Sequence, residues 1–298
     1  MSPVPAGCAR RLRHHYGSAV DTWIAHVPRQ IDDACREWGL RFVSYHDHGH
    51  ASAIAVVHDA AGTPRIVKAW PETARFRAET AALTHWYDAG VVLATITESS
   101  IALLRMIGGQ PGGHPVPAGH ESGVATAIRD LHARPLRAGN PSTYLQLSQY
   151  LTDTVRPRIA RRMESPLACP LATRVYNALA RGLPASMRGP TLLHGDLYRE
   201  NALFDQRGVP LLVDPLPMIG DPIFDWAFWV VYYDLRARTE ERLALAETAS
   251  QIDRHHILFW CLMLCLDGLL YFRETQDSRA TTMAEVLERI LTLRLVAA

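Results

Sequence analysis

Three oxygen-bearing side chains, Asp196, Asn201 and Asp214, have the types and the spacing to hold a metal ion and to move a proton. Asp196 lies in a short loop that follows an apolar run, and a second apolar run begins after Asn201. A turn at residues 206–208 sends the chain back to Asp214. Folded as a hairpin, the two runs bring Asn201 and Asp214 to the same open end. Their amide and carboxylate oxygens suit Mg²⁺, a hard cation that also takes phosphate oxygen. Asp196 is then the candidate general base for an attacking hydroxyl group.

Each of these residues also has a purely structural interpretation. Asp in a loop is often a turn former, Asn201 can cap the start of a strand, and Asp214 can be half of an Asp-Pro turn. His194 lies two residues before Asp196, but Mg²⁺ bound by oxygen needs no imidazole, and no second His follows at zinc-like spacing. We therefore expect His194 to brace the loop by hydrogen bonds. Asp225 should likewise anchor this loop rather than touch a substrate.

A second pair of charged residues lies in the first third of the chain. Lys68 is the only lysine among 31 basic residues, so a compact ammonium group is retained where a planar guanidinium would not fit. Glu79 falls within an apolar helical stripe formed by Phe76, Leu83 and Trp86. A buried carboxylate without a partner would cost several kcal/mol, about 3–5, and Lys68 is its nearest plausible partner. The alternative is that both residues lie separately on the surface.

The order of these residues has a known counterpart. Asp-x4-Asn followed by a hairpin Asp is the spacing of a kinase catalytic loop and its metal-binding Asp. The loop reads His-Gly-Asp at 194–196 and Val-Asp-Pro at 213–215, with Gly-Asp-Pro at 220–222 downstream. With Asp225, these motifs make the chain resemble the aminoglycoside phosphotransferase family of small-molecule kinases. Within it the streptomycin 6-kinase and hydroxyurea kinase branch is the most similar, over residues from about 23 to 233.

The resemblance implies a protein-kinase-like bilobal α+β fold. Residues 1–107 would form a nucleotide-binding lobe with a small antiparallel β-sheet, and residues 108–298 a mostly helical catalytic and substrate-binding lobe. The resemblance also implies roles for individual residues. Lys68 and Glu79 would hold the α- and β-phosphates, Gly49 would lie in a turn over the phosphates, and the hinge backbone would meet the base at Arg105, Met106 and Ile107.

The spacing of apolar residues, together with glycines and prolines that end helices and strands, predicts the elements that carry these residues. Helices are expected at 19–38, 72–88, 119–132, 144–163, 171–183, 221–236, 239–250, 254–272 and 280–296. Strands are expected at 40–45, 51–58, 65–70, 91–97 and 101–107, followed by a glycine-rich break at 108–113. These glycines do not form a P-loop, because no Gly-Lys-Ser/Thr follows them.

Composition restricts the partners of the chain. A net charge of +1 over 298 residues favours neither nucleic acid nor an anionic membrane surface. The first 17 residues show no signal peptide, and the apolar stretch 257–272 is interrupted by Asp267 and Gly268, so a buried helix is expected there. Five cysteines without paired spacing suit a reducing cytoplasm.

The sequence thus predicts a cytoplasmic phosphotransferase that uses Mg²⁺ and moves the γ-phosphate of ATP or GTP to a hydroxyl group of an antibiotic-like small molecule. A polycationic substrate needs a pocket rich in carboxylates, but the spacing does not gather the candidates Glu200, Asp153, Asp267, Glu274 and Asp277. Kinases of a neutral hydroxyl compound or of a metabolite therefore stay open as alternatives. A nucleotide-binding module without catalysis is the alternative outside the enzymes.

Overall fold

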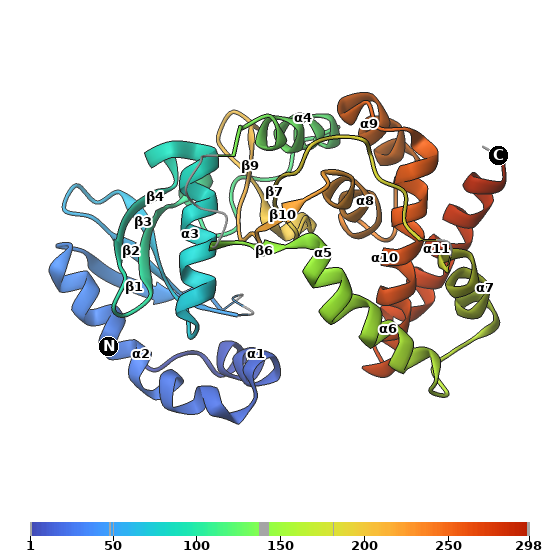
Figure 1. Cartoon of the computed structure of the whole chain (residues 1–298). Coiled ribbons are helices and arrows are strands. Elements are labelled where there is room, and N and C mark those ends of the chain that lie inside the picture. Colours follow the sequence, from blue (N-terminus) through green and yellow to red (C-terminus); the bar gives the residue numbers. More distant parts are fainter. Residues whose placement is uncertain (1, 48, 50, 137–142, 181, 297–298) are drawn as a thin grey trace. The chain divides into compact units, whose positions relative to one another are not determined.

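The computed structural model describes residues 2–47, 49, 51–136, 143–180 and 182–296 (Figure 1). The chain forms two compact units. The first consists of residues 1–117 and 203–213, and the second of residues 118–202 and 214–298. The first unit runs past the boundary expected at residue 107, and it takes in a segment from much later in the sequence.

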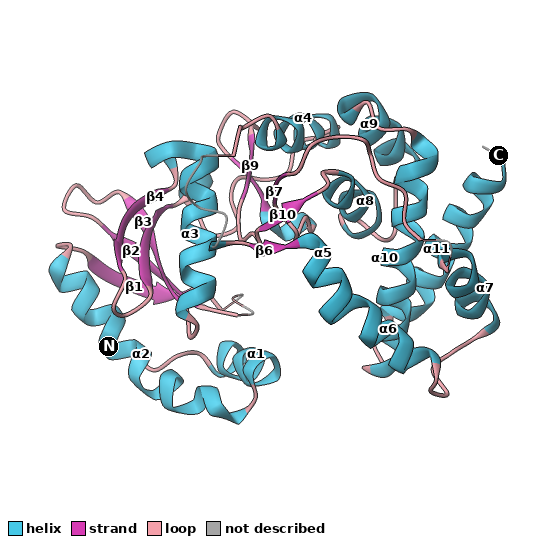
Figure 2. Cartoon of the chain, viewed as in Figure 1, coloured by secondary structure: helices cyan, strands magenta, loops and turns pink. Residues whose placement is uncertain are grey.

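The first unit is built on a five-stranded antiparallel sheet with the order β1-β2-β3-β5-β4 (Figure 2). The strands are β1 (Arg41–Tyr45), β2 (Ala53–His58), β3 (Pro64–Ala69), β4 (Val92–Ile96) and β5 (Ile101–Arg105). All five strands expected from the sequence are present; β3 is shifted by one residue from the expected 65–70, and the other four are shortened. Lys68 is paired with Ile54 on β2 and with Ala102 on β5, so it lies near the middle of the sheet.

Strand alternation gives the two faces of this sheet different partners. On one face, side chains of β2, β3 and β5 pack with helices α1 (Ala6–Tyr16) and α2 (Asp21–Glu37) in one apolar core. On the other face, Ile66, Ala102 and Leu104 pack with Trp70 and with Phe76 of helix α3 (Thr73–Tyr87). Lys68 alternates with Val67 and Ala69, which belong to the first face, so its side chain lies on the α3 face. Helix α1 was not expected from the sequence.

The hairpin of β8 (Ala202–Phe204) and β9 (Pro210–Leu212) joins the first unit through specific contacts. Leu203 and Leu211 pack with Leu83, Val91 and Ile107. The hydroxyl of Tyr87 donates to the Leu212 carbonyl at 3.0 Å and accepts from the Leu212 N–H at 2.9 Å. The hairpin expected from the sequence is therefore present. These contacts explain why a segment so late in the chain belongs to the first unit.

The second unit is mostly helical. Its helices are α4 (Glu121–His132), α5 (Leu147–Tyr150), α6 (Arg156–Met163), α7 (Pro170–Leu179), α8 (Ile223–Tyr232), α9 (Thr239–Ser250), α10 (Arg254–Glu274) and α11 (Arg279–Val296). A small sheet runs in the order β6-β10-β7, formed by Leu145–Gln146, Met218–Gly220 and Thr191–Leu193. With the antiparallel sheet of the first unit, these helices make the protein an α+β, protein-kinase-like fold, as expected.

Several details differ from the expected helices. Helices α7 and α8 end at Leu179 and Tyr232, before the expected ends at residues 183 and 236. The segment 144–163 is not one helix, because it starts as the strand β6 and contains a π-helical turn at Leu151–Val155 between α5 and α6. Helix α8 begins at Ile223, not at the expected residue 221, and has Pro222 at its N-cap. The Asp221 carboxylate accepts the Ile223 N–H at 3.0 Å, so it supports the start of the helix.

Helix α10 is the core helix of the second unit and packs against α7, α8 and α11. Within the described part of the chain it alone is long and apolar enough to cross a membrane, but 83% of its apolar window is buried inside the structure. The interpretation of residues 257–272 as a buried helix is confirmed. All five cysteines are free thiols, in agreement with the absence of paired spacing in the sequence.

Candidate active site

The loop that carries Asp196 follows the buried strand β7 in the second unit. Gly195 has a φ of 74°, and a Cβ atom at this position would lie 2.2 Å from the Leu216 carbonyl oxygen. Only glycine fits such a left-handed, closely packed position. The Leu216 N–H donates to the His194 carbonyl at 2.9 Å, which ties the loop to the chain that follows Asp214. The backbone of the loop is therefore closely specified on both sides of Gly195.

Asp225, at the start of α8, fixes the backbone of this loop by hydrogen bonds. It is fully buried, and its carboxylate accepts the N–H of His194 at 2.7 Å and the N–H of Gly195 at 2.8 Å. Nε2 of His132 donates to the same carboxylate at 2.9 Å. The expected anchoring role of Asp225 is confirmed. His132, at the end of α4, is a further contributor that was not selected from the sequence.

His194 is fully buried and acts within the loop. Its Nδ1 accepts the N–H of Asp196 at 3.4 Å, while its own N–H is taken by Asp225. No contact with a metal site is needed to account for it. The structural interpretation of His194 is confirmed.

Asp196 and Asn201 are in direct contact. Nδ2 of Asn201 donates to Oδ2 of Asp196 at 3.0 Å and to the Asp196 carbonyl at 2.7 Å. A short 3₁₀ turn at Arg199–Asn201 brings the amide back to the loop. Because the amide nitrogen faces Asp196, the amide oxygen points away from it. The contact orients the Asp196 carboxylate, which is partly exposed.

Asp214 lies directly after the hairpin that begins at Asn201. Its φ of 57° places it in the left-handed region, which non-glycine residues occupy at some cost and often near functional sites. Pairing of Asp205 with Val209 closes the hairpin loop, and counting back along both strands brings Asn201 and Asp214 to its open end. One carboxylate and one amide oxygen suit Mg²⁺, which takes its other ligands from phosphate and water. Within the described ranges, no group of three His, Cys, Asp or Glu side chains could hold a metal ion alone.

Lys68 and Glu79 form the ion pair expected from the sequence, inside the first unit. Nζ of Lys68 lies 2.5 Å from Oε1 of Glu79, and the two residues are 4% and 1% exposed. Nε1 of Trp70 donates to the other carboxylate oxygen at 2.8 Å, and the ammonium group lies 4.9 Å from the centre of the Trp70 ring. The carboxylate thus has a partner on each oxygen, as a buried charge requires.

The remaining predicted nucleotide contacts also lie in the first unit. Gly49 is buried in the connection between β1 and β2, where His48 and His50 lie outside the described residues. A Cβ atom on Gly49 would lie 2.4 Å from the Ser52 carbonyl oxygen, so close packing requires glycine there. Strand β5 ends at Arg105. Met106 and Ile107 follow it as a buried turn, and the N–H of Arg105 donates to the Val91 carbonyl at 2.9 Å.

Tyr198 follows Asp196 in the loop and contacts aromatic side chains of α8. Its ring packs edge-on against Phe228 and Tyr232, with centroids 5.2 and 5.4 Å away. Burial raises the pKa of the Tyr198 phenol, and the negative charge of Asp196 raises it further. The phenol therefore stays protonated at neutral pH.

Arginines neutralise several of the carboxylates that were considered for a cationic substrate. Asp267 accepts from Nε of Arg158 at 2.8 Å and from Nη1 of Arg162 at 3.2 Å. Arg161 and Arg162 both donate to Glu274. Hydrogen bonds from Arg161 and then Arg162 hold the pKa of the Glu274 carboxyl below its usual value. The carboxylates of this group are therefore already paired within the protein.

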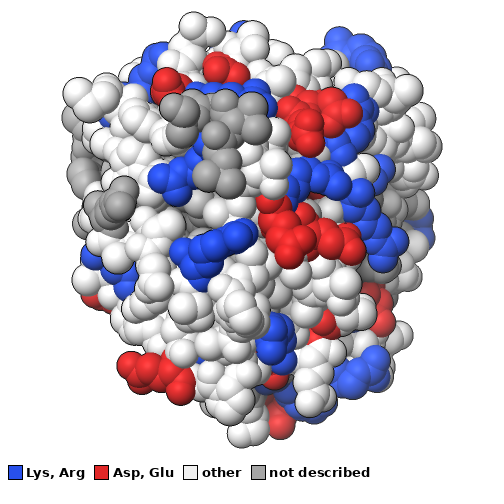
Figure 3. Space-filling view, turned by 90° about the vertical axis from the view of Figure 1, so that its right-hand side faces the viewer, with Lys and Arg blue, Asp and Glu red and all other residues white. Residues whose placement is uncertain are grey.

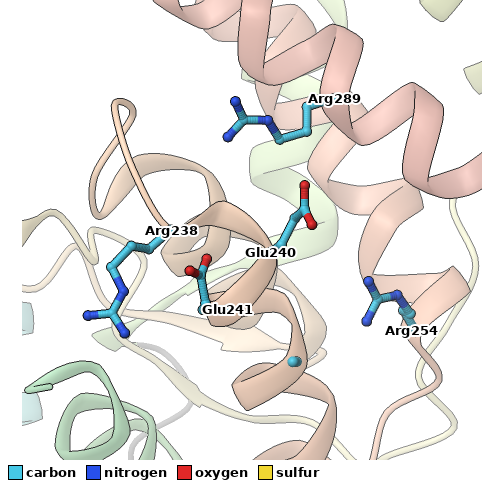
Figure 4. A pocket seen from close by; sticks show the side chains of 6 residues that line it. Arg238, Glu240, Glu241, Arg254 and Arg289 are labelled. Atoms are coloured by element: carbon cyan, nitrogen blue, oxygen red, sulfur yellow. The ribbon is translucent and has the colours of Figure 1, made fainter.

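A pocket of about 580 Å³ in the second unit lies apart from the predicted residues (Figure 4). Its charged lining residues are Arg238, Glu240, Glu241, Arg254 and Arg289, which come from the start of α9 and from α10 and α11. None of the residues selected from the sequence lines it. Charges of both signs in this pocket do not define a ligand class.

The protein-kinase-like fold, the buried Lys–Glu pair and the braced His-Gly-Asp loop define a class of protein, the small-molecule kinases. The chain matches the aminoglycoside/hydroxyurea antibiotic resistance kinase family over residues 38–275 and belongs to it. It is therefore an enzyme, a phosphotransferase with an alcohol group as acceptor, and not a binding module without catalysis.

Full-length relatives support this assignment. The chain is 26% identical to streptomycin 6-kinase of Streptomyces griseus over 286 residues, which covers 90% of each chain. It is 25% identical to hydroxyurea phosphotransferase of Kitasatospora aureofaciens over 295 residues, covering 95% of this chain and 85% of the relative. The solved structure of a macrolide 2'-phosphotransferase from Brachybacterium faecium has a TM-score of 0.60 at 16% identity, covering 87% of this chain and 95% of that one. This last similarity concerns the fold.

Proposed function

We propose that this enzyme transfers the γ-phosphate of ATP or GTP to a hydroxyl group of a small-molecule antibiotic and thereby inactivates it. The streptomycin 6-kinase relative, similar over nearly the whole chain, supports an antibiotic of that kind. The observation that carries the proposal is the loop at 194–196, where Asp225 fixes the backbone and Asn201 orients the carboxylate of Asp196.

In this proposal Asp196 is the catalytic base. It accepts the proton of the acceptor hydroxyl while the oxygen of that hydroxyl forms a bond to the γ-phosphorus and the bond to the β-phosphate oxygen breaks. Phosphoryl transfer asks the protein mainly for positioning and charge neutralisation. Asn201 and Asp214 would hold Mg²⁺, which supplies positive charge to the phosphates when it is bound.

The first unit supplies the proposed nucleotide contacts. Lys68, oriented by Glu79, binds the α- and β-phosphates as a compact positive charge. The β1–β2 connection at Gly49 covers the phosphates, and the backbone of residues 105–107 meets the base. Because backbone groups carry that last contact, side chains do not choose between ATP and GTP. Free thiols throughout favour a reducing cytoplasm as the location of the enzyme.

A second candidate function is phosphorylation of a neutral or weakly charged hydroxyl compound, such as a nucleoside-type antibiotic, hydroxyurea or a metabolite. Of the five carboxylates considered for a polycation, Asp267, Glu274 and Asp277 are paired with arginines. On the face of the molecule that Figure 3 shows, acidic side chains lie beside basic ones and form no extended acidic surface. Paired carboxylates attract a polycation weakly, and this favours a substrate of low charge.

One experiment tests both candidates. The enzyme is incubated with Mg²⁺, with ATP or GTP, and with a panel of hydroxyl compounds. The panel contains streptomycin and other aminoglycosides in one arm, and nucleoside antibiotics, macrolides and hydroxyurea in the other. The readout is a mass gain of one phosphoryl group on the compound. A gain only in the first arm supports the polycation, and a gain only in the second supports the neutral substrate. No gain in either arm would contradict the antibiotic as substrate class.

A further inference from the structure

The N-terminal helix α1 holds the connection between β1 and β2 through three side chains. Arg11 donates from Nε to the Gly49 carbonyl at 2.9 Å and from Nη2 to the Asp47 carbonyl at 2.7 Å. The same Nη2 lies 2.7 Å from Oδ1 of Asp47. One guanidinium group therefore binds two backbone carbonyls and one carboxylate of this connection.

Two neighbouring residues of α1 extend this contact to the end of the connection. The Tyr16 hydroxyl donates to the Ala51 carbonyl at 3.0 Å, and the Cys8 thiol lies 3.7 Å from the Ser52 carbonyl. Gly7 permits the close approach, because a Cβ atom there would lie 2.5 Å from the Asp47 carboxylate. The contacts thus involve Asp47, Gly49, Ala51 and Ser52 of this connection.

Helix α1 makes these contacts from the face of the sheet opposite to Lys68. Cys8 and Leu12 are buried in the core that includes Ala53, Ala55 and Val67. Since Lys68 lies on the other face, α1 can fix the connection without occupying the side on which Lys68 meets the nucleotide. Helix α1 also lies outside residues 38–275, the part of the chain that matches the family.

We propose that Arg11 is a positioning residue for nucleotide binding, with Tyr16 as its support. This inference rests on the proposed function, in which the β1–β2 connection covers the phosphates. That connection has Gly49 as its only glycine, and no glycine-rich backbone wraps the phosphates. Hydrogen bonds from Arg11 hold the carbonyls of Asp47 and Gly49 in place before the nucleotide arrives, which lowers the entropy lost on binding.

Arginine suits this task better than lysine. Its planar fork presents several N–H groups in fixed directions and can bind the carbonyls of residues 47 and 49 at once, whereas an ammonium group is a point charge on a flexible stem. Replacement with lysine should therefore restore the charge opposite Asp47 but only part of the nucleotide affinity.

The test compares Arg11→Met with Arg10→Met. Arg10 lies next to Arg11 on α1 and is exposed, so it is a matched control for the loss of one positive charge. The dissociation constants of Mg-ATP and Mg-GTP are measured by calorimetry without an acceptor, and thermal unfolding is recorded for each variant. We expect Arg11→Met to raise the dissociation constant of the preferred nucleotide roughly tenfold or more. Arg10→Met should leave this constant within about twofold of the wild-type value.

Two further variants keep the inference testable if Arg11→Met folds poorly. Tyr16→Phe removes one hydroxyl and should weaken nucleotide binding roughly threefold, and Arg11→Lys should lie between wild type and Arg11→Met. Folded Arg11 and Tyr16 variants with the nucleotide affinity of Arg10→Met would overturn the positioning role. A wild-type enzyme that binds neither nucleotide would overturn the proposed function itself, and the inference with it.

Discussion

The indole N–H of Trp70 donates a hydrogen bond to Oε2 of Glu79, so the carboxylate that pairs with Lys68 is held from two sides. Both Trp70 and Glu79 are 1% exposed. A buried carboxylate that loses one hydrogen bond keeps its desolvation cost. The Trp70 contact therefore contributes to the stability of the first unit and also to the position of Lys68.

Trp70→Phe should destabilise the protein because it removes the indole donor and leaves Oε2 of Glu79 without this partner. The matched control is Trp229→Phe, since Trp229 is also buried and its Nε1 has no hydrogen-bond partner in the structure. The free energy of unfolding, measured in urea, should fall by roughly 1–3 kcal/mol more for Trp70→Phe than for the control. Equal losses for the two variants would show that the hydrogen bond contributes nothing.

Asp196→Ala should reduce turnover without preventing nucleotide binding, because in the proposed mechanism the carboxylate acts on the acceptor hydroxyl. We expect kcat to fall by roughly 10²–10⁴-fold. Phosphorylated product is counted by mass spectrometry with whichever acceptor the panel identifies, and Asp130→Ala, on the exposed surface of α4, serves as the control. Turnover close to that of Asp130→Ala would remove Asp196 from the role of base.

Asp225→Asn should disturb the loop that carries Asp196, although Asp225 makes no proposed contact with substrate. The carboxylate accepts three hydrogen bonds, from the His194 and Gly195 N–H groups and from His132. An amide replaces one acceptor oxygen with a donor, so at least one of these bonds is lost. The free energy of unfolding should fall by roughly 1–3 kcal/mol.

The kinetic effect of Asp225→Asn should appear in kcat while KM for the nucleotide stays close to wild type, because Lys68 and Glu79 lie in the other unit. Steady-state kinetics with varied nucleotide separates the two constants. A rise in nucleotide KM with unchanged kcat would contradict the role of Asp225 in positioning the base.

The stability of the β8–β9 hairpin should depend on pH through Asp205. The N–H groups of Val209 and Arg207 donate to Oδ1 of Asp205. The hydrogen bond from Val209 holds the pKa of this carboxyl below its ordinary value, and the one from Arg207 adds to the effect. A depressed folded-state pKa gives stability that is present above about pH 3.9, the unfolded value, and lost as the pH falls through the folded value.

The comparison of wild type with Asp205→Ala checks this dependence. Urea unfolding at neutral pH should show wild type to be more stable, and the difference should shrink once the pH drops below the folded pKa of Asp205. A difference that stays constant through the acid range would mean that ionisation of Asp205 does not support the hairpin.

Much of the first unit could be predicted because local signals and tertiary contacts agree. The strand alternation around Lys68 and the helical stripe around Glu79 both predicted that these side chains are buried. Since a buried charge needs a partner, the two opposite charges were expected to pair with each other. The same alternation puts residue 70 on the Lys68 face, so Trp70 could have been found as a further partner of Glu79. Helix α1 could not be predicted in the same way, since its polar composition hides the buried Cys8 and Leu12.

The key residues of the loop at 194–196 could be predicted from the sequence, but not all of the side chains that hold the loop in place. Gly195 between His194 and Asp196 indicated a tight turn, and Asp225 was expected beneath it. His132 comes from a helix about sixty positions earlier in the chain, and no periodicity connects the two segments. The π-helical turn at residues 151–155 was also not predicted, because the buried residues Leu147, Leu151, Val155 and Ile159 are spaced by four, as in an ordinary α-helix.

The buried position of Lys68 has a practical consequence, because it is the only lysine in the chain. Apart from the terminal amine, acylating or aldehyde reagents have a single primary amine to attack, and it is 4% exposed and paired. If Lys68 binds the nucleotide as proposed, an amine-directed nucleotide analogue would label one known atom, Nζ of Lys68. Covalent labelling by such a compound, and protection by the natural nucleotide, would count functional molecules in a preparation without knowledge of the acceptor.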